Sequence, residues 1–195
     1  MHNPIFSSGM TPHIPQYSQA LQLFRQGAYP RAITLFQQVL ASHPTHAECR
    51  LQLVKACLDW VGVLAQMPLV EVDPEQLGGE AMHYLQFAQA QLDMLVKSHP
   101  ASPHVQSLQA TIYLIYGRAE DALTSLKKAL AKDKHNPALL YNQAYSLMQL
   151  GRYVEAVAVL ERLTVFSPNH GKGWYMLGVA RHAAGGLEEA LPAYR

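Results

Sequence analysis

Small and large apolar residues recur along the chain with a fixed period. Gly117, Gly151 and Gly185 are equally spaced, thirty-four positions apart, and Gly27 lies far enough before Gly117 to leave room for two such periods and a further twenty-two positions. Each glycine has a small residue seven positions before it, alanine five positions after it and a large apolar residue nine positions after it. The small residues are Ala20, Ala110, Ala144 and Gly178, the alanines are Ala32, Ala122, Ala156 and Ala190, and the large residues are Phe36, Leu126, Leu160 and Tyr194.

This arrangement predicts pairs of antiparallel helices, each pair joined by a tight turn at glycine. The small residues let the two backbones approach, and the large ones fill the remaining space. Pro44, Pro100 and Pro168 follow the expected second helices and end them, and Pro30 suits the first turn of a second helix. We therefore predict an all-helical chain built from repeated helix pairs.

The second pair departs from the pattern and takes up the extra length. Val61 stands where the turn glycine is due, and the helical pattern continues toward Met67. Residues 73–76 then read as a helix N-cap, a proline at the first helical position and a capping-box partner, closed by two glycines. This predicts an inserted loop or short helix around residues 67–80, between the two helices of the pair.

Residues 151–170, GRYVEAVAVLERLTVFSPNH, and 173–195, GWYMLGVARHAAGGLEEALPAYR, resemble tetratricopeptide repeats through W-x2-L-G, G-x4-A and a closing proline. The resemblance covers residues 13–195 and implies an all-α fold, a right-handed superhelix of antiparallel helix pairs with about 4.5 repeats. We expect a flexible N-terminal segment at 1–12, followed by repeats at 13–46, 47–102 with the insertion, 103–136, 137–170 and, truncated, 171–195. The departures from the family pattern are Gln16, Gln106 and Leu140 in place of tryptophan, and Lys134 in place of the closing proline.

In a superhelix of this kind the first helices line a concave groove. Projecting the repeat spacing onto them gives an apolar, tyrosine-rich surface that suits a non-catalytic scaffold binding a peptide or protein segment. Each of these residues, taken singly, favours packing over binding at about two to one. The predicted groove residues are Tyr17, Leu21, Phe24, Leu51, Leu58, Thr111, Leu114, Tyr141, Asn142, Tyr145, Met148, Lys172, Tyr175, Val179 and His182.

Some members of the family bind the C-terminal carboxylates of a partner with lysine, asparagine and arginine on three successive first helices. The corresponding residues in the last three repeats are Ser107, Thr111, Asn142, Lys172 and Met176, so two of five match. This argues against a clamp of that type. Asn142 could still bond a peptide backbone and Lys172 an acidic group, and solvated polar groups are an equally good interpretation.

Charge and cysteine content narrow the class of partner. Fifteen Lys and Arg against fourteen Asp and Glu give no basic excess, which argues against nucleic acid. The most apolar stretch, residues 56–70, carries Asp59 and is too short to span a membrane. Cys49 and Cys57 lie eight apart in one expected helix, too far for a disulfide, so we expect free thiols and a cytoplasmic protein.

Candidate chemistry is sparse. The ten histidines are scattered, with no HExxH motif and no Cys/His set at zinc-like spacing, and no nucleotide-binding or nucleophile motif is present. We expect no enzyme activity, cofactor or metal.

The sequence reaches Arg195 midway through an expected second helix, in which Pro192 should introduce a bend, and this leaves an apolar edge of Ala190, Leu191 and Tyr194.

That edge keeps two alternatives open. The chain could be the N-terminal repeat domain of a longer enzyme of the glycosyltransferase, sulfotransferase or oxygenase type. It could instead be a structural unit that self-associates through its C-terminal edge.

Overall fold

The computed structural model describes residues 14–66 and 74–185, and all regular secondary structure in these residues is helical. The chain divides into two compact units, Met1–Pro100 and Ala101–Arg195. Each unit is built from consecutive helices that pack on their neighbours in the chain.

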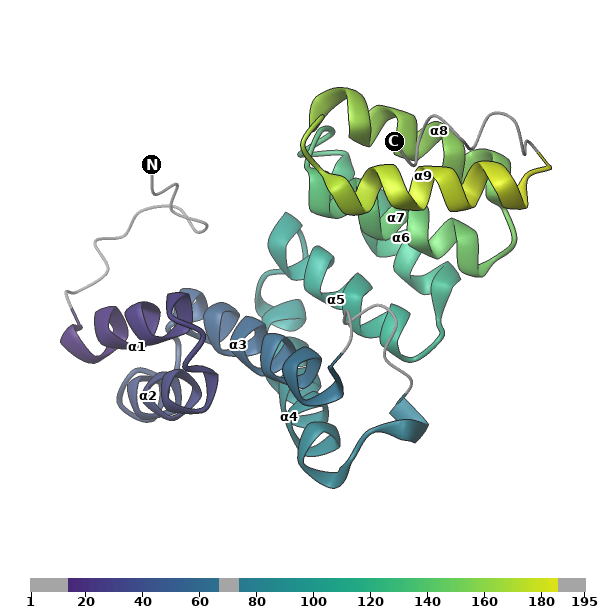
Figure 1. The fold of residues 1–195 in the computed structure, drawn as a ribbon. Coiled ribbons are helices and arrows are strands. Elements are labelled where there is room, and N and C mark those ends of the chain that lie inside the picture. The colour runs from purple at the N-terminus through teal and green to yellow at the C-terminus, as the bar shows by residue number, and fades with distance from the viewer. Residues whose placement is uncertain (1–13, 67–73, 186–195) are drawn as a thin grey trace. The chain divides into compact units, whose positions relative to one another are not determined.

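The N-terminal unit contains four α-helices: α1 (Pro15–Arg25), α2 (Tyr29–Ser42), α3 (Ala47–Ala65) and α4 (Gly79–Ser98). Helix α2 packs on both α1 and α3, and α4 packs along α3 (Figure 1). The unit therefore consists of two stacked helix pairs.

The C-terminal unit continues this pattern. Its described helices are α5 (Pro103–Ile115), α6 (Ala119–Leu130), α7 (Pro137–Gln149), α8 (Tyr153–Phe166) and α9 (Gly171–Ala183). Each packs on the next, and α5 also contacts α7, so first helices of successive pairs lie side by side (Figure 1).

Glycine makes the turn inside the regular pairs, as the sequence predicts. Gly27, Gly117, Gly151 and Gly185 all have positive φ, between 67° and 95°, a conformation that an L side chain adopts only at a cost. At Gly151, two backbone bonds close the turn: its N–H donates to Met148 at 3.0 Å and the next residue donates to Leu147 at 2.9 Å. The positive φ explains why glycine recurs at a fixed spacing.

The alternating small and large residues occupy the interior, which also follows the prediction. Within the described residues, every alanine and every large apolar residue named for this pattern is fully buried, and Gly178 is buried too. In the C-terminal unit Ala144, Ala156 and Leu160 belong to one apolar cluster. Ala190 and Tyr194, like Leu191, Pro192 and the segment 1–12, lie outside the described residues.

Proline marks the ends of most second helices. Helices α2, α4 and α8 each end two residues before a proline, at Ser42, Ser98 and Phe166. Helix α6, which is followed by Lys134 instead, already ends at Leu130. The closing proline thus prevents α2, α4 and α8 from continuing, but a second helix can also end without it.

The extra residues of the second pair lengthen both of its helices. Helices α3 and α4 have 19 and 20 residues, against 13 and 12 in α5 and α6. Val61 is fully buried within α3, which continues to Ala65 and ends with Gln66 in the left-handed conformation. Pro74–Gln76 forms a single 3-10 turn, and α4 begins at Gly79; residues 67–73 lie outside the described part.

Candidate protein-interaction surface

Helix α7 presents one stripe of half-buried apolar side chains. Tyr141, Tyr145 and Met148 are spaced by four and three residues, so they share one side of the helix, and all three pack against the apolar cluster of the C-terminal unit. One part of each side chain supports the core and the remainder is accessible. These three residues are the centre of the candidate surface.

Helix α9 repeats the stripe with greater exposure. Tyr175, Val179 and His182 each lie one repeat period after the three α7 positions. Tyr175 is 66% exposed, His182 is exposed and Val179 is half-buried. Lys172, near the start of the same helix, is also exposed. An aromatic ring with two-thirds of its area accessible is the most prominent feature of this side of the unit.

Polar contacts join α5 to α7 beside this stripe. The Asn142 side-chain amide donates to Thr111 Oγ1 at 3.2 Å, and the Thr111 hydroxyl donates to the Ser107 carbonyl at the same distance. The structure therefore brings Asn142 and Thr111 together. Asn142 uses one amide hydrogen inside the unit, and its other hydrogen and its oxygen could meet a partner.

Three predicted groove residues of the N-terminal unit, Tyr17, Leu21 and Phe24, are half-buried, as the three residues of the α7 stripe are. Tyr17 is half-buried, with its ring 5.0 Å from that of His46, and burial raises the pKa of its phenol, which stays neutral. Leu21 is half-buried, and Phe24 makes an edge contact with Tyr29 at 5.9 Å. None of the tyrosine, phenylalanine and tryptophan side chains described in this unit is exposed as Tyr175 is.

Three of the predicted groove residues are buried. Leu51, Leu58 and Leu114 are at most 1% exposed. Side chains so completely covered contribute to packing and offer no area to a partner. Tyr17, Leu21 and Phe24 remain predicted groove residues of the N-terminal unit. The remaining predicted residues of the C-terminal unit form the set that we call the first-helix surface: Thr111, Tyr141, Asn142, Tyr145, Met148, Lys172, Tyr175, Val179 and His182.

Two histidines cap first helices, a role that the sequence analysis did not anticipate. His170 Nδ1 accepts from the Gly173 amide at 2.9 Å, and His46 Nδ1 accepts from the Cys49 amide at 3.1 Å. Each ring also lies against the tyrosine of the preceding first helix: His170 is 5.6 Å from Tyr141, just as His46 lies against Tyr17. The spacing from tyrosine to histidine is the same in both repeats, and this repetition is the feature of the sequence that could have indicated the shared role. These caps orient the tyrosine at each repeat junction.

The His46 cap predicts a dependence of stability on pH. Burial lowers the pKa of His46 below its ordinary value of 6.5, so the unfolded chain takes up the proton first as pH falls. The stability that the folded state gains from neutral His46 is complete above the ordinary pKa of 6.5. It is lost as the pH falls from 6.5 through the lowered pKa of the folded state. We expect the wild type to lose up to about 1.4 kcal/mol per pH unit more than His46→Asn, which keeps a capping acceptor without titrating.

The measurement is urea unfolding at pH about 7 and about 5. The chain has two tryptophans, Trp60 in the N-terminal unit and Trp174 in the C-terminal unit, so a Trp174→Phe background reports on the unit that contains His46. His182→Asn, at an exposed position, controls for the loss of a histidine. Equal pH dependence in wild type and His46→Asn would contradict the capping role.

A second missed feature is a pair of donors at equivalent positions of two repeats. Trp174 Nε1 donates to the Pro168 carbonyl at 2.7 Å, and Arg50 Nη2 donates to the Pro44 carbonyl at 2.6 Å. In both cases the acceptor lies six residues earlier. Both bonds hold the end of one repeat to the start of the next, which satisfies a carbonyl at the closing proline.

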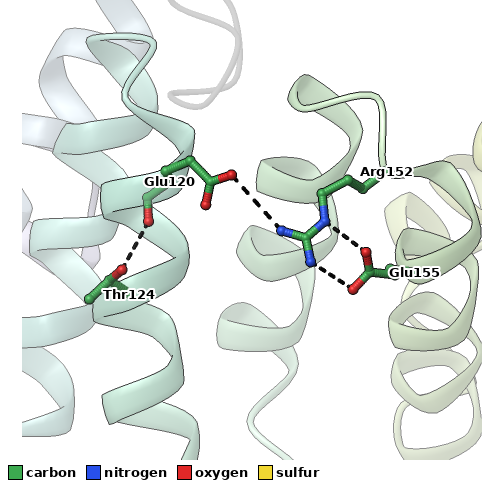
Figure 2. A network of polar contacts seen from close by, with 4 residues as sticks. All are labelled: Glu120, Thr124, Arg152 and Glu155. Atoms are coloured by element: carbon green, nitrogen blue, oxygen red, sulfur yellow. Dashed lines mark hydrogen bonds and ion pairs between the residues drawn. The ribbon is translucent and has the colours of Figure 1, made fainter.

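The outer turns of the C-terminal unit are held by exposed ion pairs (Figure 2). Arg152 makes two hydrogen bonds with Glu155, at 2.7 and 2.8 Å, and lies 4.0 Å from Glu120 on the neighbouring second helix. These hydrogen bonds hold the pKa of Glu155 below its ordinary value. Arg118 pairs with Asp121 in the same way one repeat earlier. Because these groups are solvated, they orient the turns and add little stability.

The two cysteines are buried and unreactive. Burial raises the pKa of Cys49 and Cys57 to about 12, so both thiols are protonated near neutral pH and are poor nucleophiles. No group of three or more His, Cys, Asp or Glu side chains in residues 14–66 and 74–185 could hold a metal ion. No helix in this part of the chain is long and apolar enough to cross a membrane.

Comparison with known proteins agrees with this architecture. The family model described as Tetratricopeptide repeat matches residues 23–59 and 113–178, more than half of the chain. The chain belongs to the tetratricopeptide-repeat family. No sequence match to a curated protein was found. Repeats of this family are generally non-catalytic scaffolds, and membership supports a protein-interaction scaffold in general for this chain.

Solved tetratricopeptide-repeat structures resemble the whole fold. A crystal structure of MamA protein superposes with a TM-score of 0.65 at 16% identity, covering 92% of this chain and 88% of that one. TTC0263, a thermophilic TPR protein in Thermus thermophilus, gives 0.63 at 20% identity, covering 92% and 87%. A MamA RS-1 ArsTM double mutant gives 0.67 at 13% identity, covering 92% and 89%. The predicted all-α tetratricopeptide-repeat fold is confirmed.

Proposed function

We propose that this tetratricopeptide-repeat chain binds an extended or helical segment of a protein partner on its first-helix surface, in the cytoplasm. The observation that carries the proposal is the exposure of Tyr175. Its equivalent on α7, Tyr141, is half-buried against the core, so one tyrosine is supported by packing and the other is largely accessible. Tyrosine buries a large area at low entropic cost, which suits a binding residue.

The polar residues around this stripe favour a peptide over a lipid or a small molecule. The Asn142 amide group has bonding capacity beyond its contact with Thr111, and an extended backbone presents both donors and acceptors. Lys172 is exposed and could meet an acidic side chain of the partner. Apolar contacts would supply affinity, and the amide and the ammonium would select register and orientation.

Tyr175→Ala tests the proposal without disturbing the core. A partner is first identified by affinity capture and mass spectrometry and then titrated by calorimetry. We expect Tyr175→Ala to weaken binding about tenfold, the loss of about 1.4 kcal/mol, while helical content stays the same. Tyr141→Ala with Tyr145→Ala should weaken it further, but these side chains also pack against the core, so stability is measured alongside.

Val165→Ala is the matched control. Val165 is 72% exposed on α8, a second helix, and lies outside the first-helix surface. It should leave the affinity unchanged. If Tyr175→Ala binds the partner as tightly as Val165→Ala does, the partner does not use the first-helix surface.

The alternatives of a longer enzyme and of self-association through the C-terminal edge remain predictions. The downstream reading frame decides the first. For the second, sedimentation over a range of concentrations is decisive, since a strict monomer with a stable C-terminus excludes it.

A further inference from the structure

Arg50 is a buried cation whose described partners are all neutral. Its side chain is 8% exposed, and its guanidinium donates to the Pro44 carbonyl, to Gln91 Oε1 and to Met94 Sδ, the last at 3.2 Å. None of the ion pairs in residues 14–66 and 74–185 involves Arg50. Removing a charge from water is costly, so buried arginines are usually matched by a carboxylate.

The structural role of Arg50 does not require its charge. Trp174 makes the equivalent bond to a proline carbonyl with a neutral N–H, and the corresponding residue of the fourth repeat, Leu140, is fully buried and apolar. Gln106, the corresponding residue of the third repeat, is buried and polar but neutral, so Arg50 differs from Gln106, Leu140 and Trp174 in carrying a charge. Such departures are expected where a residue has a function besides packing.

Met94 covers the guanidinium on α4. Its side chain is 50% exposed although its sulfur lies against Arg50 Nη1. A thioether is a weak acceptor, and methionine is unbranched and changes rotamer readily. A carboxylate would be a far better acceptor for the same donor, because arginine binds carboxylates with short, charge-assisted and often paired hydrogen bonds.

We propose that Arg50 is a carboxylate-binding site in which Met94 is a displaceable cover. The carboxylate could come from an acidic side chain of a partner, from its C-terminus or from a small anion, since all three present the same group. The site lies in the N-terminal unit, on residues that the first-helix surface does not include. The site would give a partner a positively charged group to bind, which neither the net charge of the chain nor its exposed residues indicate.

Methionine-methyl NMR on the full chain tests binding at the site directly. Acetate replaces chloride at constant ionic strength, and the Met94 methyl signal, assigned with Met94→Leu, should shift and saturate. A peptide with one internal glutamate and a peptide with a free C-terminus distinguish the sources, and an amidated glutamine peptide is the control. Arg50→Trp, which keeps an N–H for the Pro44 carbonyl as in Trp174, should abolish the shift. An unmoved Met94 signal with every carboxylate overturns the proposal.

A second measurement does not depend on finding a ligand. Met94→Glu places a carboxylate beside Arg50, whereas Met94→Gln places a neutral group of the same size there. We expect Met94→Glu to unfold at a temperature about 2–4 °C higher than Met94→Gln, and this difference to vanish in the Arg50→Trp background. Equal unfolding temperatures of the glutamate and glutamine variants would show that the guanidinium does not bind a carboxylate in this place.

Discussion

Phe36→Ala is expected to lower the free energy of unfolding of the N-terminal unit by about 3–5 kcal/mol. Phe36 is fully buried on α2, its ring lies 6.0 Å from that of Tyr17 on α1, and its carbonyl accepts from the Cys49 thiol on α3 at 3.5 Å. The residue therefore lies where three helices meet, with its side chain fully buried. Its removal would leave a cavity that helices on three sides cannot readily fill.

Urea unfolding in the Trp174→Phe background measures this loss, because Trp60 then reports on the N-terminal unit alone. Phe166→Ala provides the matched control. Phe166 is 50% exposed, and its ring centre lies 3.9 Å from that of His135 in a tilted contact. Its truncation should cost less than about 1 kcal/mol in the C-terminal unit, read from Trp174. Similar losses for the two substitutions would contradict the assignment of Phe36 to the core.

The sequence predicts the helix pairs well because their turns depend on local conformation. Gly117 and Gly151 adopt a positive φ that depends on the turn itself and not on distant contacts, and added Cβ atoms there would meet nothing within 4 Å. Backbone conformation alone selects glycine at these positions, so its period reports the fold directly. The fully buried alanines on the first and second helices carry the same information, since close packing of two helices requires them.

The sequence predicts that α3 continues past Val61 toward Met67, and α3 ends at Ala65, but the start of α4 could not be predicted in the same way. Val61 occupies the expected turn position but suits a continuing helix equally well, and it is buried when α3 continues. The choice depends on whether a partner helix of matching length exists. That partner is α4, which begins at Gly79, the second of two glycines that follow Pro74 and read locally as a loop. Packing between the two long helices, and not local propensity, decides the outcome.

The exposure of side chains in the candidate site could not be predicted from the sequence either. Repeat spacing identifies which residues share a side of a first helix, but exposure also depends on what lies next to that side. Leu51 and Tyr175 both come from the same projection, yet one is fully buried and the other is 66% exposed. Arg50 illustrates the converse, because a charged residue in a predicted helix is normally solvated, and only the packing of α4 reveals that it is buried.

Ala144→Leu is expected to lower the free energy of unfolding of the C-terminal unit by about 1–3 kcal/mol. Ala144 is fully buried on α7 in the same apolar cluster as Ala156 and Leu160 of α8, where the two helices approach. The larger side chain would force the backbones apart or move leucines out of their preferred rotamers. Because the repeat places a small residue at this point in every regular pair, the substitution tests the packing rule on which the fold depends.

The measurement uses Trp174 fluorescence in a Trp60→Phe background, which reports on the C-terminal unit alone. Ala158→Leu is the matched control, because it adds the same atoms to an exposed position of α8 and should change stability by less than about 0.5 kcal/mol. The interior of this unit has an alanine at the helix crossing and leucines around it, so added volume should be destabilising only at Ala144. Equal tolerance of leucine at both positions would mean that the helices of this pair are not in close contact at Ala144.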